Sequence, residues 1–236
     1  YLESIFNKTT IVRVDRDSAR KKYFMKDMNE KISQGGPCIL IGTQMLAKGH
    51  DFKHITSVFV LDTDAELFHP DFKSQERLGQ LLTQVAGRGG RGISSSEIFL
   101  QTYYPNHPLL EKLTNGNYKE FLQEIAKERE TTSMPPFSFV TLIRANSVNE
   151  NNVVDILNLV KKMVERVDPQ SSQNQYLGPI PSMLEKRAGR YRYNFQIKTH
   201  TRSKMHILLT KLIEQLSKTK SFSNVRWSID VDPIEL

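Results

Sequence analysis

Two arginines in a glycine-rich segment are the residues of this chain best suited to chemistry. Arg88 and Arg91 lie three residues apart within residues 84–92 (QVAGRGGRG), directly after a helical pattern. The planar guanidinium stays charged and binds phosphate oxygens at two points. A pair at this spacing could stabilise the charge that develops on a γ-phosphate during hydrolysis. A flexible Arg/Gly loop that binds nucleic acid fits the same letters, so the spacing leaves both interpretations open.

A second polar segment comes directly after an apolar run. Residues 38–41 (CILI) indicate a buried strand, and residues 42–52 (GTQMLAKGHDF) follow at its end. Residues 42–48 are the nearest approach to the phosphate loop of a nucleotide-binding lobe, but Ala47 stands where that loop needs its second glycine. A strand also ends at Asp62, but Thr63 replaces the glutamate that would activate water. The chain is therefore expected to lack a complete nucleotide-hydrolysing centre of its own.

The composition indicates a globular chain of one or two domains with a basic balance. Lys and Arg number 33 against 26 Asp and Glu, a formal net charge of +7 over 236 residues. This charge suits a partner of nucleic acid, although many proteins are equally basic. The single cysteine excludes an internal disulfide and a cysteine-based zinc site, and no metal site is predicted. No apolar run approaches the ~18 residues that a membrane span needs.

Residues 1–106 alternate strand-like and helix-like segments. Strands are expected at residues 10–15, 38–41, 57–62 and 97–103, and helices at residues 19–32 and 71–86. This alternation predicts a parallel sheet flanked by helices. Asp51 and the arginines after the second helix then fall in loops at the carboxyl ends of strands, where such sheets bind ligands.

Residues 107–134 are expected to form a helical connector that ends at Pro135 and Pro136, because proline lacks an amide donor and restricts the residue before it. Residues 135–236 then predict the order strand, helix, strand, strand, helix, strand. Apolar residues recur at helical spacing in residues 153–167 and 205–216, and residues 225–231 alternate like a half-buried strand. The fold class is α/β, with a split β-α-β-β-α-β sandwich as the second domain.

The basic residues concentrate in this second domain. Seven Lys or Arg and no Asp or Glu occur between Lys186 and Lys204. In strand geometry Tyr191 and Tyr193 share a side with the apolar residues that follow them, and the cations point to the other side. We predict that this basic row binds DNA phosphates through Lys186, Arg187, Arg190, Arg192 and Lys198. The alternative is a solvated polar face. The two tyrosines are expected in the core, with base stacking as the alternative.

Several long segments together resemble one known family. They are GTQMLAKGHDF, QVAGRGGRG, LQTYYPNHPLL and the terminal WSIDVDPIEL, spread from residue 42 to residue 236. With them the chain resembles the PriA family of primosomal replication-restart DNA helicases, which belong to helicase superfamily two. The resemblance covers essentially the whole chain. It implies a C-terminal fragment in which residues 1–106 are a RecA-like second helicase lobe, incomplete at its start, and residues 135–236 are the family's C-terminal domain.

The resemblance also implies roles for individual residues. Arg91 would be the arginine finger, Arg88 a second γ-phosphate contact, and Gln84 would line the same cleft. Asp51 and Gly49 would lie near the nucleotide. The remaining residues that the resemblance assigns are Thr43, Gln44 and Lys48 on the DNA side, and Arg202 and His206 in a pocket for a protein partner. His206 stands where better-known relatives carry glutamine, and Gly89 departs from the commoner GRAGR pattern.

Cofactors, partners and location follow from the same resemblance. The full enzyme would use ATP with Mg²⁺ for 3′-to-5′ unwinding at stalled forks, and would carry zinc in an upstream segment that is not in this chain. Its partners would be forked and single-stranded DNA, the acidic tail of single-stranded-DNA-binding protein and the helicase-loading proteins of the primosome. A cytoplasmic monomer is expected, and the fragment alone is expected to be inactive. The alternatives are a non-enzymatic DNA-binding or scaffolding module and, third, a ribosome-associated or RNA-binding protein.

Overall fold

The computed structural model describes residues 1–14, 28, 30, 36–43, 55–89, 97–169, 174–218 and 224–235, with the backbone alone at residues 88 and 89. Within it the chain divides into two compact units. Unit 1 comprises residues 1–69 and 74–121, and unit 2 comprises residues 70–73 and 122–236. Both units mix helices with strands, as the sequence predicts.

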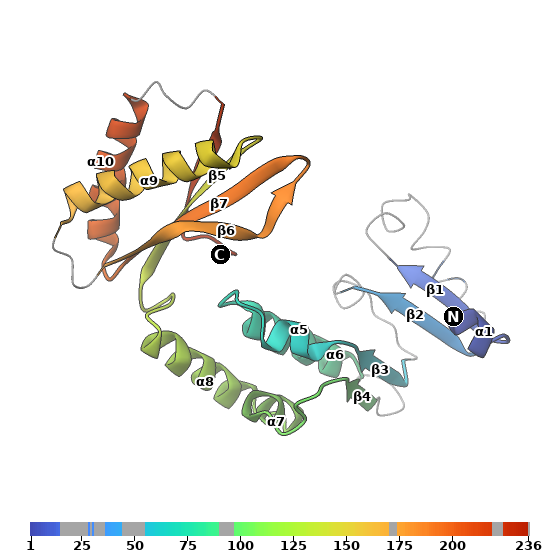
Figure 1. Ribbon diagram of the computed structural model, residues 1–236. Coiled ribbons are helices and arrows are strands. Elements are labelled where there is room, and N and C mark those ends of the chain that lie inside the picture. The colour runs from blue at the N-terminus through green and yellow to red at the C-terminus, as the bar shows by residue number, and fades with distance from the viewer. Residues whose placement is uncertain are drawn as a thin grey trace. The chain divides into compact units, whose positions relative to one another are not determined.

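The strands of unit 1 form two parallel pairs (Figure 1). β1 (Thr10–Val14) pairs with β2 (Cys38–Gly42), and β3 (Ser57–Val60) pairs with β4 (Glu97–Leu100). A parallel pair requires a long crossover connection, which the sequence spacing provides. The predicted parallel strands are confirmed. In the described part of the chain they form two separate two-stranded sheets, not one continuous sheet.

Five helices have residues in the described part of unit 1, and α7 among them has a side-chain cap. They are α1 (Leu2–Ile5), α5 (Thr63–Leu67), α6 (Ser74–Gly89), α7 (Pro108–Thr114) and the start of α8 (Tyr118–Thr131). α7 has Pro108 in its first turn, and the His107 ring nitrogen Nδ1 accepts a hydrogen bond from the Leu109 amide at 3.3 Å. Gly116, at φ +75°, separates α7 from α8, so the connector is two helices and not one.

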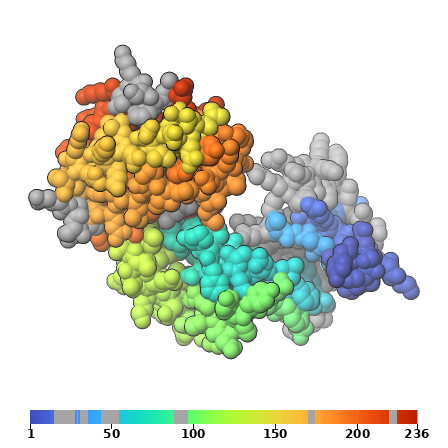
Figure 2. All heavy atoms as spheres, in the orientation of Figure 1, coloured from blue at the N-terminus to red at the C-terminus, as the bar shows by residue number. Residues whose placement is uncertain are grey.

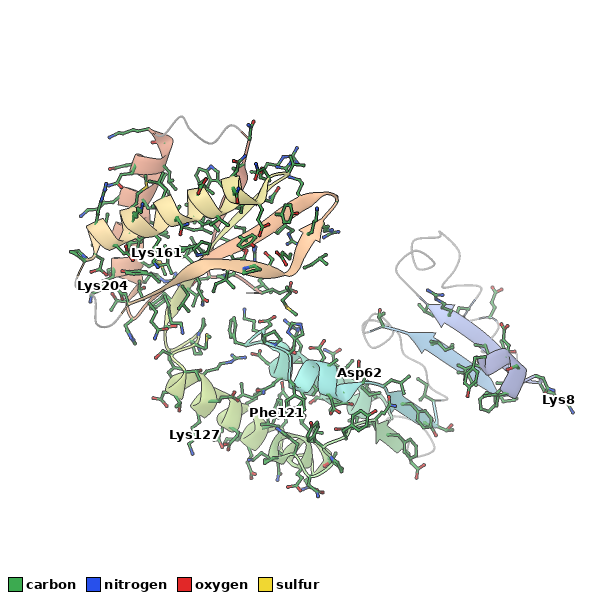
Figure 3. All side chains as sticks on the ribbon, in the orientation of Figure 1. Lys8, Asp62, Phe121, Lys127, Lys161 and Lys204 are labelled. Carbon is green, nitrogen blue, oxygen red and sulfur yellow. The ribbon has the colours of Figure 1, made fainter. Side chains whose placement is uncertain are left out.

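One close approach fixes how α6 meets the start of α8. Phe121, labelled in Figure 3, is fully buried and stacks on Tyr118 with ring centroids 5.8 Å apart. A Cβ added to Gly79 of α6 would lie only 2.3 Å from the Phe121 ring. Glycine at this position therefore leaves the space that the aromatic ring occupies.

After the remainder of α8, the described part of unit 2 is a four-stranded antiparallel sheet with two further helices. Its elements follow the order β5 (Phe139–Ser147), α9 (Glu150–Val167), β6 (Gln175–Arg187), β7 (Arg190–Thr199), α10 (Arg202–Ser217) and β8 (Arg226–Val231). The strand order across the sheet is β6-β7-β5-β8. α9 and α10 pack on the same face of the sheet (Figure 1), and we call the other face the open face.

The core of unit 2 lies between the helices and the sheet. The apolar spacing in the sequence identifies most of it: Val153, Ile156, Leu157, Val160, Met163 and Val164 of α9, and Met205, Leu208, Leu209, Leu212 and Leu216 of α10, are buried. Ile213 is the exception, because its side chain is 48% exposed. It follows Leu212 by one residue and so turns about 100° away from the buried stripe.

The chain after β8 returns to the open face. The Asp232 amide donates to the Val140 carbonyl oxygen at 2.9 Å, and an Arg144 Nη2 donates to the Glu235 carbonyl oxygen at 2.8 Å. Val140 and Leu142 point to the open face, since they alternate with Thr141 and Ile143 of the core side, and both are nevertheless buried. The part of this face at Val140 and Leu142 is therefore covered by the protein itself, and the opposite end, at Asn146, is the more exposed one.

Candidate nucleic-acid interface

A tight turn brings the cations of β6 and β7 opposite each other. Ala188 and Gly189 have φ values of +50° and +76°, the left-handed conformation that two-residue hairpin turns require. The turn pairs Arg187 directly with Arg190. Arg187 is exposed and Arg190 is half-buried. Figure 2 shows that β6 and β7 form much of the visible surface of unit 2 beside α9.

Asn146 lies between arginines from three directions. On β5 it is the register partner of Arg192 on β7 and of Arg226 on β8. Arg190 donates to it twice, from Nε to the Asn146 Oδ1 at 2.7 Å and from Nη2 to the Asn146 carbonyl oxygen at 3.1 Å. All three arginines therefore belong to one end of the open face, and we call them the arginine cluster.

Arg226 is the member of this cluster that the sequence analysis missed. Its signal is visible in residues 225–231, where Val225, Trp227 and Ile229 alternate with polar residues. If the apolar residues face the helices, the residues between them must face the open side. Arg226 and Arg192 lie on the same end of the sheet because β8 and β7 both pair with β5 at Asn146. Sequence periodicity does not reveal which strands pair.

The neighbouring row of the same face is neutralised. Arg144 forms an ion pair with Asp230, from Nη1 to Oδ2 at 2.5 Å, and also holds the Glu235 carbonyl oxygen. By contrast, Arg192 and Arg226 form no hydrogen bond or ion pair with the part of the chain that the structure describes. Among the described residues, the free positive charge on this face thus lies in the arginine cluster and at Arg187 beside it.

Lys198 does not face solvent, which corrects the prediction of a continuous exposed basic row. It is only 5% exposed, and its Nζ donates to the Thr132 carbonyl oxygen at 3.2 Å. Burial lowers the pKa of this lysine, because desolvation disfavours the charged ammonium. The segment just before β5 covers the end of β7 where Lys198 lies. Lys198 is therefore not one of the exposed cations.

The tyrosines lie on the helix side, as predicted. Tyr193 is buried in the core cluster, and Tyr191 packs against it. The Tyr193 hydroxyl donates to the Glu150 carboxylate, and this hydrogen bond, together with burial and the charges of Glu150 and Glu185, raises the tyrosine pKa to about 12. The Lys186 Nζ lies 4.4 Å from the centroid of the Tyr191 ring. Lys186 is thus exposed but held against an aromatic face.

The two residues of the expected protein-binding pocket both lie on α10. Arg202 begins the helix, forms an ion pair with Asp232 at 3.2 Å and lies over the Phe139 ring at 5.2 Å from its centroid. His206 is exposed one turn later. Residues four apart on a helix share a face, so the structure brings Arg202 and His206 together at the surface.

The residues predicted to bind the nucleotide, and the three DNA contacts predicted between residues 43 and 48, lie mostly outside the part of the chain that the structure describes. Gln84 is exposed on α6, Arg88 lies in the last turn of that helix, and Thr43 is exposed just after β2. Gln44, Lys48, Gly49, Asp51 and Arg91 lie outside the described residues. Their roles stay predictions, as do those of Gln84, Arg88 and Thr43.

Two further structural findings concern the described residues alone. No group of three His, Cys, Asp or Glu side chains among them is arranged to hold a metal ion. None of the helices within these ranges combines the length and the apolar character needed to cross a membrane.

Comparison with known proteins identifies the family. Residues 130–234, which contain the whole four-stranded sheet and both of its helices, match the family model of the primosomal protein N C-terminal domain. The replication restart protein PriA of Haemophilus influenzae is 38% identical over 235 residues, which cover 100% of this chain and 32% of that protein. The chain belongs to the PriA family. This confirms the resemblance found in the sequence.

Two other PriA proteins are also similar over nearly the whole chain. The PriA proteins of Synechocystis and Bacillus subtilis are 34% and 31% identical, over 95% and 98% of this chain and 26% and 29% of their own lengths. The chain thus spans about a third or less of the curated relatives it matches. Among solved structures, the de novo designed protein Foldit4 aligns with 41% of the chain at 19% identity and a TM-score of 0.29, too weak a likeness to support an argument.

Proposed function

We propose that this chain is part of an ATP-dependent 3′-to-5′ DNA helicase that restarts stalled replication forks and takes part in assembling the primosome. The observation that carries the proposal is the similarity along nearly the whole chain to proteins named replication restart protein PriA. The parallel strand pairs of unit 1 support a RecA-like second helicase lobe, which has a parallel sheet. The unit 2 elements support a split β-α-β-β-α-β domain at residues 135–236.

In this proposal Arg91 is the arginine finger, Arg88 is the second phosphate contact and Gln84 lines the same cleft. ATP and Mg²⁺ would bind mainly to the first helicase lobe, which carries the phosphate loop. Asp51 and Gly49 would approach the nucleotide from this chain. An arginine finger acts by stabilising charge at the transition state, so its loss lowers hydrolysis far more than binding.

Unit 2 would supply the surface that holds forked or single-stranded DNA. Its support is the arginine cluster with the exposed Arg187 and Lys186, because cations that neutralise phosphates release counterions and so dominate affinity. Arg202 and His206 would bind the acidic tail of single-stranded-DNA-binding protein. Thr43, Gln44 and Lys48 would contact DNA from unit 1.

The DNA proposal is tested by fluorescence anisotropy with single-stranded, duplex and forked oligonucleotides across a salt series. The informative variant is Arg187/Arg192→Ala, because neither side chain has a partner in the described structure whose loss would disturb the fold. We expect tighter binding to forked or single-stranded DNA, and in the variant a slope of log K against log salt reduced by roughly 1.4 on single strands. Lys161, on the helix side of unit 2 (Figure 3), provides a matched control as Lys161→Ala. An unchanged salt slope in the Arg187/Arg192→Ala variant would indicate that the basic face of β6 and β7 is a solvated surface that does not bind DNA.

The helicase proposal is tested by DNA-dependent ATP hydrolysis in a protein that joins this chain to a first helicase lobe. We expect Arg91→Ala to abolish hydrolysis while DNA affinity stays within twofold of the unsubstituted protein. Normal turnover in that variant would remove the finger assignment. If no hydrolysis appears with either protein but DNA still binds, the chain is a DNA-binding or scaffolding module instead.

A further inference from the structure

A cavity of about 610 Å³ opens where β5 passes into α9, at the same end of the sheet as the arginine cluster. Its polar lining consists of Arg190, Arg226, Ser147 and the three asparagines Asn149, Asn152 and Asn224. The volume lies within the ~300–1,000 Å³ range that is usual for small-molecule sites. It exceeds what one phosphate group needs, so a sugar attached to the phosphate also has room.

The lining of this cavity is chemically suited to an anion. It contains two guanidinium groups and no Asp or Glu among the described lining residues. The acidic residue that follows Asn149, Glu150, is engaged by the Tyr193 hydroxyl on the core side of the sheet. Among its described lining residues the cavity therefore has strong cationic donors and no carboxylate to compete with a bound phosphate for them.

Arg190 is held by hydrogen bonds within the protein, whereas Arg226 is exposed, and this difference suits the binding of a phosphate. Arg190 is fixed by two hydrogen bonds to Asn146, donated by its Nε and Nη2. Its remaining guanidinium N–H groups can donate to another acceptor. Arg226 is exposed, with no partner in the described structure. A preoriented donor and an adjustable one can close on the same group from two strands.

Helix α9 adds a weaker electrostatic contribution at the same place. Asn149 caps the helix by accepting from the Asn151 amide at 3.0 Å, and Asn152 is the third helical residue. The amino end of an 18-residue helix carries partial positive charge, which favours a nearby anion. This contribution supports the site, but the two arginines define it.

We propose that this cavity holds one phosphodiester of a bound DNA strand, with Arg190 and Arg226 as its two ligands. The inference rests on the DNA-binding function proposed above and adds a location and a residue, Arg226, to it. A polymer is favoured over a free nucleotide because the charge continues beyond the cavity. Arg192 lies two strands from Arg226, about 9.6 Å away across the sheet, and Arg187 lies opposite Arg190.

The test compares Arg226→Ala and Asn152→Asp with the unsubstituted 236-residue chain in anisotropy titrations on a fluorescein-labelled 15-nucleotide oligothymidylate. We expect Arg226→Ala to weaken binding roughly tenfold and to reduce the salt slope by about 0.7, the loss of one phosphate contact. Asn152→Asp places a negative charge in the cavity and at a position that favours the helix. It should therefore weaken binding without lowering the melting temperature, which separates lost binding from lost folding.

Two controls test whether the effect is specific to Arg226 and whether the bound phosphate belongs to DNA. Arg166→Ala, which removes an exposed arginine at the other end of α9, should leave affinity within twofold. Thymidine monophosphate should not displace the oligonucleotide at submillimolar concentration. Displacement by the monophosphate, or Arg226-dependent binding of an acidic peptide instead of DNA, would overturn the proposal.

Two further outcomes distinguish failure of the cavity proposal from failure of the DNA-binding function proposed for unit 2. Binding that falls in Arg187/Arg192→Ala but not in Arg226→Ala would remove the cavity and keep the DNA interface. Absence of DNA binding by the unsubstituted chain would remove both.

Discussion

Replacement of Gly79 by alanine probes the packing of α6 against α8. Alanine stabilises a helix interior by about 1 kcal/mol relative to glycine. At a position where the added Cβ meets no other atom, Gly→Ala should therefore raise the free energy of unfolding by about 1 kcal/mol. At Gly79, however, the added Cβ would lie 2.3 Å from Cε1 and 2.7 Å from Cζ of Phe121, against 3.4–4 Å for an ordinary contact. The ring would have to move by about 1 Å. Phe121 is fully buried and stacked on Tyr118, so little room exists for that movement.

The expected magnitude follows from these two opposing contributions. Overpacking of a filled core costs about 1–3 kcal/mol. Gly79→Ala should therefore lower the free energy of unfolding by about 0–2 kcal/mol once the helix gain is subtracted. Gly87 in the same helix has nothing within 4 Å of an added Cβ and is the matched control. Gly87→Ala should raise stability by about 1 kcal/mol.

The assay is thermal and urea unfolding followed by far-ultraviolet circular dichroism. The difference between the two variants, about 1–3 kcal/mol, corresponds to roughly 2–12 °C in Tm for a chain of this size. Phe121→Leu in the Gly79→Ala background should make the alanine less costly than it is alone, because the ring that it meets is gone. Equal stabilisation by Gly79→Ala and Gly87→Ala would show that Phe121 does not lie over Gly79.

Two further predictions concern side chains of the sheet. The hydrogen bond that raises the pKa of Tyr193 to about 12 should stabilise the fold fully below pH 10, the ordinary tyrosine value, and this contribution should be lost as the pH rises through 12. In urea titrations the gap between the unsubstituted chain and Tyr193→Phe should therefore shrink from pH 8 to pH 11.5, and a constant gap would contradict the assigned bond. Lys198→Met should leave oligonucleotide affinity within twofold, because the Lys198 ammonium is buried against the Thr132 carbonyl. A loss as large as that of Arg187/Arg192→Ala would place Lys198 in the DNA contact.

Local patterns in the sequence predicted the order of helices and strands in unit 2 and most of their buried faces. The apolar residues of α9 and α10 recur at helical spacing, and the side chains of β7 alternate, because these two periods follow from backbone geometry alone. Each pattern therefore specified most of the side chains that enter the core, with Ile213 as the exception, without knowledge of the partner element. The segments that resemble the PriA family, from residue 42 to residue 236, were likewise recognisable from the sequence alone.

Tertiary structure decided which of the exposed-looking cations are free. Lys198 continues the alternation of Arg190 and Arg192, yet the segment around Thr132, 66 residues earlier in the chain, covers it. Arg144 is neutralised by Asp230, 86 residues later. Arg226 joins Arg192 only because β8 and β7 both pair with β5 at Asn146. Strand order and register depend on contacts between distant segments, whereas periodicity indicates only which side of its own strand a residue faces. The sequence therefore predicted the basic face, and only the tertiary structure determined which of its arginines are free to bind a ligand.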